Sequence, residues 1–480
     1  MKKIDTIFNF FILFFSLFLN AQNNKPNIIV IMTDDLGYND VSFNGSKDIP
    51  TPNIDLIAKN GVKFTNAYTS YSVCGPSRAG FITGRYQQRF GFERNPQYRS
   101  DDLNMGLPKE ENTIAEALAK VNYTSGIIGK WHLGSHITNH PLNRGFNEFF
   151  GHLGGGHSYF PEMLTIKDGD FTTDQVDVPQ EGRKRRWKGS AENASYKTWI
   201  TRNNKPVKTS KYLTEEFSEE AVSFIERHKD KPFFLFLSYN APHTPMQATK
   251  KYLDRFPNIE NKKRKTYAAM VSAVDDGVGL LLDKLKALNL EENTLVFFLS
   301  DNGGPEPKNA SDNGILREGK SSIYEGGYRV PYALQWKGTL KPGVFEHPVS
   351  SLDIFATIAS LSNTSIKKDK PLDGVNLIPF LKGKNIEMPH KNIYLRKYDN
   401  DLHAVRDGDL KLIVKWKGSK KELYNLKEDI GEKKDISKQY PKEVKRLNNI
   451  LKEWESKLID PVFLGLIHTK AWKKKGKGKN

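Results

Sequence analysis

Four short apolar runs, each followed at once by polar and reactive side chains, constrain the fold of this chain most strongly. Their length and almost continuous apolar character are typical of strands buried on both faces of a parallel sheet. Stretches with helical periodicity lie between them, and this alternation predicts an α/β domain with a mostly parallel central sheet flanked by helices. The runs span residues 28–32, 126–129, 233–237 and 295–299, and the helical stretches span 51–61, 113–120, 213–228 and 267–288.

The side chains that follow the runs are acids, amides, lysines and histidines. Open α/β sheets bind their ligands at the carboxyl ends of the strands. We therefore expect a functional site at that edge of the sheet. The residues concerned are Asp34, Asp35, Lys130, His132, His243, Asp301 and Asn302.

The two acidic pairs predict a metal site. Asp34 and Asp35 follow the first run, and Asp301 and Asn302 follow the fourth. Three carboxylates and an amide oxygen suit a hard divalent cation, Ca²⁺ or Mg²⁺. Without a cation, clustered carboxylates repel one another. The alternative is that these residues only cap helices and form turns.

The pattern changes after Leu352. Residues 351–361 have helical periodicity, and a segment punctuated by glycine and proline begins near residue 373. Short strands separated by turn residues follow, and then a further helix. This order predicts a small α+β domain with an antiparallel sheet. The strands span 393–395, 402–405, 411–415 and 422–426, and the helix spans 443–458.

The chain has one cysteine, Cys74, which excludes a disulfide framework within the chain and a cysteine-rich zinc site. It lies just ahead of a predicted helix that begins at Pro76 and ends at Gly84. Free amides at a helix start favour an anion, and Arg78 is close in sequence, so Cys74 is a candidate nucleophile. The alternative is a buried cysteine that acts as a small apolar residue.

The first residues have the pattern of a secretory signal. Lys2 and Lys3 precede an apolar stretch at 7–19, and Ala21 offers a small residue for cleavage. We expect residues 1–21 to be removed and the mature protein to be exported, to the periplasm, the cell surface or the medium. No cysteine follows the stretch, which argues against a lipoprotein anchor. The alternative is a buried helix; no later segment predicts a membrane span.

The net charge of +17 favours an anionic partner. No helix-turn-helix, zinc finger or RNA-binding aromatic signature is present, so we expect no nucleic acid. A polyanionic substrate is the remaining interpretation. Basic clusters lie at 183–186 and 473–479, the second within a tail, 466–480, that is typical of a solvated chain end.

The segment around Cys74 carries a family resemblance. Its pattern, Cys-x-Pro-Ser-Arg followed by Thr-Gly-Arg, resembles the signature of the formylglycine-dependent, type I sulfatases of the alkaline phosphatase superfamily. Further matching motifs follow in order, and the resemblance is weakest from 158 to 211. It implies an alkaline-phosphatase-like catalytic domain over 22–370 and a C-terminal α+β subdomain over 371–465. The matching segments are 33–35, 74–85, 129–134, 241–245, 300–304, 319–331 and 422–426.

The resemblance also implies a cofactor chemistry. Cys74 would be oxidised after synthesis to formylglycine (3-oxoalanine) by a formylglycine-generating enzyme. One hydroxyl of the hydrated aldehyde would attack sulfur, and collapse to the aldehyde would expel sulfate. One Ca²⁺ ion would be held by Asp34, Asp35, Asp301 and Asn302 together with the modified Cys74.

The other motif residues acquire roles by the same resemblance. Arg78 would orient the hydrate, and Lys130 and Lys320 would bind sulfate oxygens. His243 would protonate the leaving sugar oxygen, and His132 would take a proton from the second hydroxyl. Taken alone, the lysines are also typical of surface charges and the histidines of core or loop residues.

The implied activity is hydrolysis of sulfate esters on a sulfated poly- or oligosaccharide, in the manner of a bacterial polysaccharide sulfatase. An algal polymer such as ulvan or carrageenan fits the signal segment and the basic charge. His157 and the cluster at 183–186 are candidates for sugar contacts. Two alternatives stay open: a phosphate or phosphonate ester hydrolase of the same superfamily, and a catalytically silent carbohydrate-binding protein.

Overall fold

The computed structural model describes residues 25–160 and 200–468. The predicted signal segment, the basic cluster at 183–186 and residues 469–480 of the predicted tail lie outside these ranges. Among the described residues, none of the helices combines the length and the apolar character that crossing a membrane requires.

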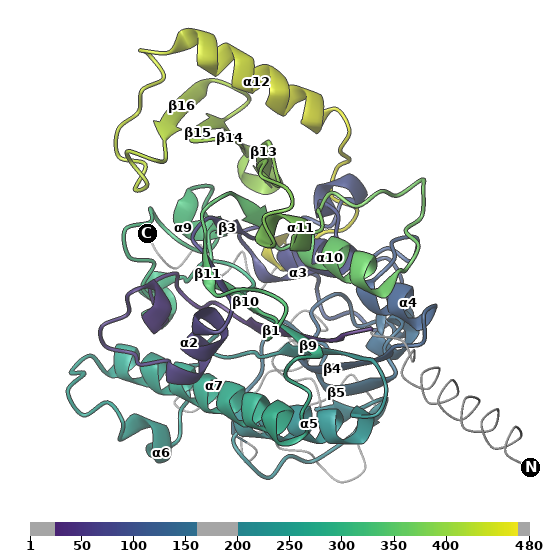
Figure 1. Ribbon diagram of the computed structural model, residues 1–480. Helices are drawn as coiled ribbons and strands as arrows, with labels where there is room; N and C mark the ends of the chain where they lie inside the picture. Colours follow the sequence, from purple (N-terminus) through teal and green to yellow (C-terminus); the bar gives the residue numbers. More distant parts are fainter. Residues whose placement is uncertain (1–24, 161–199, 469–480) are drawn as a thin grey trace, which may run out of the picture.

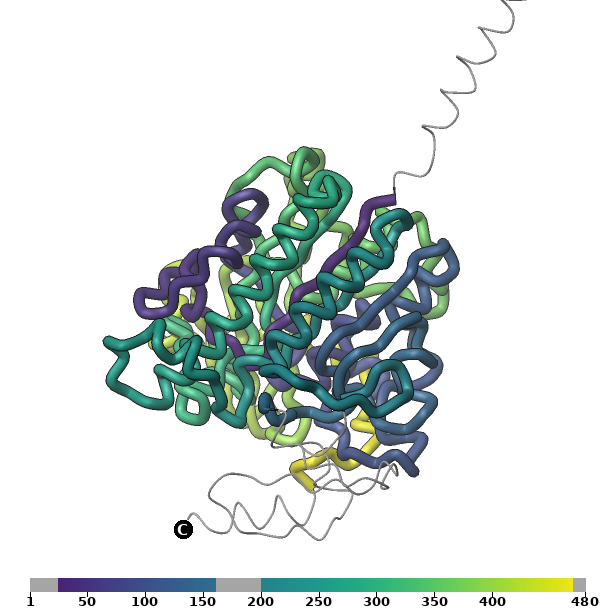
Figure 2. Tube along the Cα trace, turned by 90° about the horizontal axis from the view of Figure 1, so that it is seen from below, coloured from purple at the N-terminus to yellow at the C-terminus, as the bar shows by residue number. Residues whose placement is uncertain are grey.

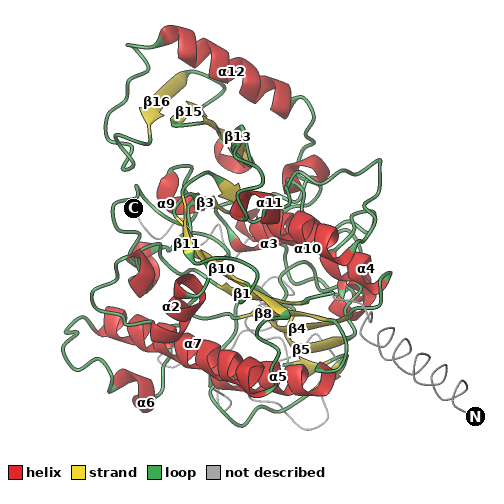
Figure 3. Cartoon of the chain, in the orientation of Figure 1, coloured by secondary structure: helices red, strands yellow, loops and turns green. Residues whose placement is uncertain are grey.

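A ten-stranded sheet forms the centre of the larger domain (Figure 3), in the order β11-β2-β10-β9-β1-β8-β4-β5-β6-β7. The four predicted runs are β9, β1, β8 and β4, which are consecutive neighbours and all parallel. Strands β6, β7 and β10 pair antiparallel, so the sheet is mostly parallel, as predicted. The bounds are β1 Asn27–Thr33, β2 Val62–Phe64, β4 Thr124–Lys130, β5 Glu148–His152, β6 Thr201–Arg202, β7 Lys205–Pro206, β8 Phe233–Ser238, β9 Thr294–Ser300, β10 Tyr332–Gln335 and β11 Gly343–Phe345.

Helices cover both faces of this sheet (Figure 1). Because side chains alternate along a strand, Ile29 and Ile31 of β1 join one apolar cluster, while Ile28 and Val30 join the other. Figure 2 shows α5 and α7 side by side across the first face. The first face carries α2 (Pro52–Lys59), α5 (Leu213–His228) and α7 (Lys262–Ala287), and the second carries α3 (Cys74–Thr83), α4 (Ile114–Ala119), α10 (Asp353–Ser362) and α11 (Ile378–Leu381).

The helix bounds differ from prediction at a few ends. Helix α7 begins at Lys262 rather than at residue 267, because the Asn261 side chain accepts hydrogen bonds from the amides of the first turn. Helix α3 begins at Cys74 itself, two residues before the predicted start. The predicted capping box of α4 is present, with Thr113 and Glu116 bonded reciprocally.

The C-terminal part forms the predicted antiparallel sheet, ordered β13-β14-β15-β16. Helix α12 (Pro441–Glu455) covers its outer face, and its inner face packs against the larger domain (Figure 1). Helix α11 belongs to the larger domain's core, and the domain boundary at residue 371 stays a prediction. The bounds are β13 Asn392–Lys397, β14 Leu402–Asp407, β15 Leu410–Lys415 and β16 Lys420–Asn425.

Candidate active site

The carboxyl ends of β1 and β9 bring the two predicted acidic pairs together. The two strands pair in register up to Thr33 and Ser300, so the acids that follow them emerge side by side. Oxygen atoms of Asp34, Asp35 and Asp301 and the sulfur of Cys74 lie within 4.8 Å of one another, and all four residues are buried. The convergence that the strand pattern predicts is therefore present.

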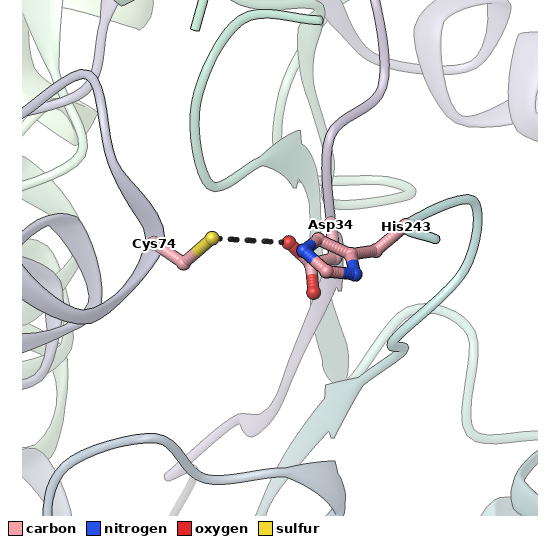
Figure 4. A group of neighbouring side chains, drawn as sticks. All are labelled: Asp34, Cys74 and His243. Carbon is pink, nitrogen blue, oxygen red and sulfur yellow. Dashed lines mark hydrogen bonds between the residues drawn. The ribbon is translucent and has the colours of Figure 1, made fainter. Parts of the chain in front are cut away.

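Helix α3 delivers Cys74 to this cluster at its first residue. The Cys74 Sγ atom lies 3.4 Å from Asp34 Oδ1, and Figure 4 shows it pointing toward that carboxylate, with His243 beside Asp34. One turn further along the helix, Arg78 Nε donates to Asp301 Oδ2 at 2.8 Å. Arg78 also donates to the Ser238 hydroxyl at 2.5 Å, and the two hydrogen bonds fix the position of the guanidinium.

Both predicted lysines turn inward, so they are not free surface charges. Lys130 is fully buried, and its Nζ lies 2.5 Å from Asp34 Oδ2. Lys320 Nζ lies 2.5 Å from Asp35 Oδ1 and 3.0 Å from Cys74 Sγ. Although burial opposes the charge of Lys320, Asp35 and Cys74 hold its pKa well above the usual value. Two ammonium groups thus flank the sulfur atom and its acids.

The two predicted histidines lie at the same site. His243 Nε2 is 3.7 Å from Asp35 Oδ2. The hydroxyl of Tyr159 donates to the carbonyls of Asn240 and His243, at 2.6 and 2.8 Å, and so fixes the loop that carries His243. Burial lowers the pKa of His243, and the charges of Asp34 and Asp35 act in the opposite direction.

His132 is held in an unusual backbone conformation, with φ at 61°. Both of its ring nitrogens are buried and have no hydrogen-bond partner in the part of the chain that the structure describes. Burial and the charge of Lys130 hold its pKa well below the usual value. A Cβ on Gly155 would lie 2.6 Å from His132 Nε2, so the glycine-rich loop leaves the space that this ring needs.

The oxygen donors fit a hard divalent cation. Asn302 Nδ2 donates to Asp35 Oδ1 at 2.7 Å, whereas Asn302 Oδ1 is buried and has no partner among the described residues. Burial and the neighbouring charge of Asp34 raise the pKa of Asp301 to about 6. Burial would also raise the pKa of Asp34, but Lys130 and the other cations hold it below its usual range. A bound cation would relieve this repulsion and use the free amide oxygen.

The Cys74 thiol itself is a poor nucleophile at this site. Burial and the charge of Asp34 raise its pKa to about 12, so the sulfur stays protonated at neutral pH. The charges of Lys130 and Lys320 lower the pKa, but they do not compensate for this effect. The surroundings of Cys74 in this form therefore oppose a thiolate.

Sequence reasoning missed Ser238 and Tyr159, which hold the site without carrying an obvious motif. Ser238 ends β8, and its position at a strand end was the available signal. His157 lies buried with its ring centroid 5.0 Å from that of His152. A contact between His157 and a sugar stays a prediction, and the cluster at 183–186 lies outside the described residues.

Comparisons with known proteins identify the family. The sulfatase family profile matches residues 26–364, and the profile "N-sulphoglucosamine sulphohydrolase, C-terminal" matches residues 319–459. N-acetylgalactosamine-6-sulfatase of Mus musculus is 33% identical over 404 residues, covering 80% of this chain and 71% of the mouse protein. The uncharacterised sulfatase YdeN of Escherichia coli is 30% identical over 528 residues, covering 90% of this chain and 86% of that protein.

A solved structure resembles almost the whole chain. Ps i-CgsB in complex with k-i-k-neocarrahexaose is 39% identical, with a TM-score of 0.83, and the match covers 95% of this chain and 98% of that one. The fold, the motif residues and these relatives agree with one another. The chain therefore belongs to the sulfatase family, the type I sulfatases of the alkaline phosphatase superfamily, and is a sulfuric ester hydrolase.

Proposed function

We propose that this enzyme removes sulfate from carrageenan or its oligosaccharides, using formylglycine formed from Cys74 and one Ca²⁺ ion. The observation that carries the chemistry is the buried cluster of Asp34, Asp35, Asp301 and Asn302 around Cys74. The similarity to a structure that holds a neocarrahexaose supports carrageenan before ulvan. The substrate and the mechanism are proposals that rest on these two observations.

The two groups fit the residues present. Formylglycine at position 74 supplies, as its hydrate, the hydroxyl nucleophile that the protonated Cys74 thiol does not provide. Ca²⁺, held by Asp34, Asp35, Asp301 and the free Asn302 Oδ1, supplies positive charge against the sulfate oxygens. Arg78 is anchored by Asp301 and Ser238 and has a second nitrogen, Nη2, that is buried and unpartnered among the described residues. That nitrogen is available to orient the group at position 74.

The two lysines would bind the sulfate group. Lys130 and Lys320 each contact one acid of the cluster, at 2.5 Å. When the acids ligate a cation, the ammonium groups have charge to offer to sulfate oxygens instead. Lys320 lies 3.0 Å from Cys74 Sγ, and Lys130 contacts Asp34, the acid beside that sulfur, so both suit an anion bound at residue 74.

The two histidines would move protons. His243 is exposed enough to meet a sugar, with 13% of its side chain accessible, and Asp34 and Asp35 favour its protonated form against the effect of burial. It would give a proton to the leaving sugar oxygen. His132 is buried and neutral with two unpartnered nitrogens, so it would accept the proton whose departure releases sulfate.

The cellular context is part of the proposal. The pattern of residues 1–21 supports export to the periplasm, the cell surface or the medium, where algal polysaccharides are met. Conversion of Cys74 requires a formylglycine-generating enzyme as a partner in the host. The poor nucleophilicity of the thiol supports that requirement.

A sulfate-release assay tests the proposal. The matured protein meets carrageenan, ulvan and glycosaminoglycan oligosaccharides, with phosphate release measured in parallel, with and without chelator, beside Cys74→Ala. We expect sulfate from carrageenan oligosaccharides, lost with chelator and in Cys74→Ala. Sulfate from another substrate alone would replace the sugar assignment. Phosphate release in place of sulfate would favour the phosphoesterase alternative, and no release from a preparation with confirmed formylglycine would favour a silent binding protein.

A further inference from the structure

Strand β15 of the C-terminal sheet places two lysines on a buried face. Side chains alternate along the strand, so Leu412 and Val414 join the apolar cluster under α12, whereas Ile413 joins the cluster against the larger domain. Lys411 and Lys415 lie on the same face as Ile413, and they are 0% and 8% exposed. Burying two ammonium groups is costly unless each one has partners.

One of the two partners of Lys411, Glu325, belongs to a segment close to the active site. Its Nζ lies 2.9 Å from Glu325 Oε1 and 2.8 Å from Glu432 Oε1, and all three residues are fully buried. Glu325 also accepts a hydrogen bond from the Tyr68 hydroxyl at 2.5 Å. It is the first residue of the short helix α9 (Glu325–Tyr328), five residues after Lys320.

Lys415 holds the neighbouring residue of the same segment. Its Nζ lies 2.6 Å from the hydroxyl of Tyr324, which in turn donates to Glu422 Oε2 at 2.9 Å. The Arg317 guanidinium lies 3.8 Å from the centre of the Tyr324 ring and donates to the carbonyl of Glu432. The C-terminal subdomain thus contacts both ends of the stretch that contains Lys320.

Residues 317–328, which we call the Lys320 segment, form a closed loop. The amide of Gly326 donates to the carbonyl of Arg317 at 2.9 Å, so the two ends are joined. Between them, the amide of Ser321 donates to the carbonyl of Ser72 at 2.8 Å, two residues before Cys74. Lys397 of β13 contacts the Ser321 carbonyl from the C-terminal sheet. A loop anchored in this way transmits its position directly to the Lys320 ammonium.

We propose that Lys411 and Lys415 are positioning residues for the reaction: through Glu325 and Tyr324 they fix the Lys320 segment, and so place the Lys320 ammonium beside residue 74. The acids that Lys411 and Lys415 contact are glutamates of the subdomain interface, not the aspartates of the active site. The inference rests on the proposed function for the role of Lys320, because Lys320 is taken to bind sulfate. A displacement of about 1 Å at such a group is enough to slow a reaction substantially.

The test uses Lys415→Met in the full, matured chain. Lys420 Nζ lies 2.8 Å from Glu422, so this change leaves no carboxylate without a cation. Arg446→Met is the matched control, because Arg446 of α12 pairs with Asp407 and Glu443 on the outer side of the subdomain. Tyr324→Phe, which removes only the hydroxyl that Lys415 contacts, is the second variant if Lys415→Met folds poorly. The readouts are amide hydrogen exchange over residues 317–328, thermal unfolding, and kcat/KM with and without Lys320→Ala.

We expect Lys415→Met to exchange faster over the Lys320 segment and to lose about tenfold in kcat/KM, while Arg446→Met changes neither. When Lys415→Met is added to Lys320→Ala, kcat/KM should fall little further, because the effect of Lys415 passes through Lys320. Unchanged exchange, or an equal loss of kcat/KM in both backgrounds, would overturn the inference. Hydrogen exchange needs no turnover, so failure of the wild type to release sulfate would count against the proposed function alone.

Discussion

Among the residues that the structure describes, two buried clusters of polar and charged side chains differ in whether their polar atoms have partners. The active-site cluster contains Asp34, Asp301 and Asn302; the cluster at the subdomain interface contains Glu325, Lys411 and Glu432. In the first, the oxygen of Asn302 and a nitrogen of Arg78 have no partner among the described residues. In the second, Glu432 Oε1 also forms no hydrogen bond of regular geometry, but it lies 2.8 Å from the Lys411 ammonium, and Glu325 Oε1 lies 2.9 Å from the same group.

Shifted pKa values do not separate the two clusters. Burial and Asp34 raise the pKa of Asp301 to about 6, and burial raises that of Glu432 to about 7. Although burial works in the opposite direction, Lys411 lowers the pKa of Glu325 to about 2. Each cluster thus contains one raised and one lowered acid. Polar atoms that have neither a hydrogen bond nor an opposite charge beside them, rather than perturbed acids, distinguish a site that receives ligands from one that holds two subdomains together.

The largest predicted effect separates activity from stability at the active site. Asp301→Asn should reduce sulfate release roughly 10⁴-fold, because a metal ligand and an anchor of Arg78 lose their charge. The metal-free variant should unfold at nearly the wild-type temperature, since the raised pKa of Asp301 means that its charge already opposes folding. Kinetics and thermal unfolding of the chelated proteins check this pair. A large loss of stability in metal-free Asp301→Asn would contradict this prediction, because the active-site cluster would then stabilise the fold as the interface cluster does.

The second prediction reverses that pattern at the interface. Lys411→Met should destabilise the protein by about 3–5 kcal/mol, because it removes the cation that lies between the buried acids Glu325 and Glu432 and leaves Glu325 with Arg329, 3.4 Å away. Adding Glu432→Gln should recover part of the loss. Denaturant unfolding of the two variants beside the wild type measures both values. If Lys411→Met were as stable as the wild type, the charges at the interface would not contribute to the stability of the fold.

A smaller effect is expected where the glycine-rich loop meets His132. Gly155→Ala places a Cβ 2.6 Å from His132 Nε2, so the ring must move. We expect kcat to fall about tenfold with little change in thermal unfolding. Gly383→Ala is the control for an added methyl group, since a Cβ there meets nothing within 4 Å. Gly383, unlike Gly155, has a positive φ, which an alanine strains. Any loss of stability in this control must therefore be subtracted.

The smallest effect concerns pH and the C-terminal sheet alone. His403 of β14 pairs with Glu455 of α12 and with Asp401; despite its burial, these acids raise its pKa. A raised folded-state pKa stabilises below the unfolded value, near 6.5, and this stability is lost as the pH rises through the folded value. His403→Gln should therefore cost about 1 kcal/mol at pH 6 and less at pH 9, with activity unchanged. A pH-independent difference would contradict the ion pairs.

Much of the active site follows from the sequence, because apolar runs that end in reactive residues also end at one edge of a parallel sheet. The inward lysines of β15 do not follow from it, since lysines that flank Leu412, Ile413 and Val414 are typical of an exposed strand end. Lys411 is buried against Glu325 and Lys415 against Tyr324, and both partners lie far away in the chain. The start of α7 was missed because its first turn has no apolar residue to reveal the periodicity. The role of Gly155 depends on a ring that approaches from another loop.

The most direct test of the central claim is the mass of the peptide that contains Cys74, measured on preparations of graded sulfatase activity. The account predicts that active preparations carry the aldehyde form, which is lighter than the cysteine form, and that sulfate release rises in proportion to the converted fraction. Full activity in a preparation whose Cys74 is entirely unmodified would contradict it. The thiol, whose pKa burial raises to about 12, would then be performing chemistry that its surroundings oppose.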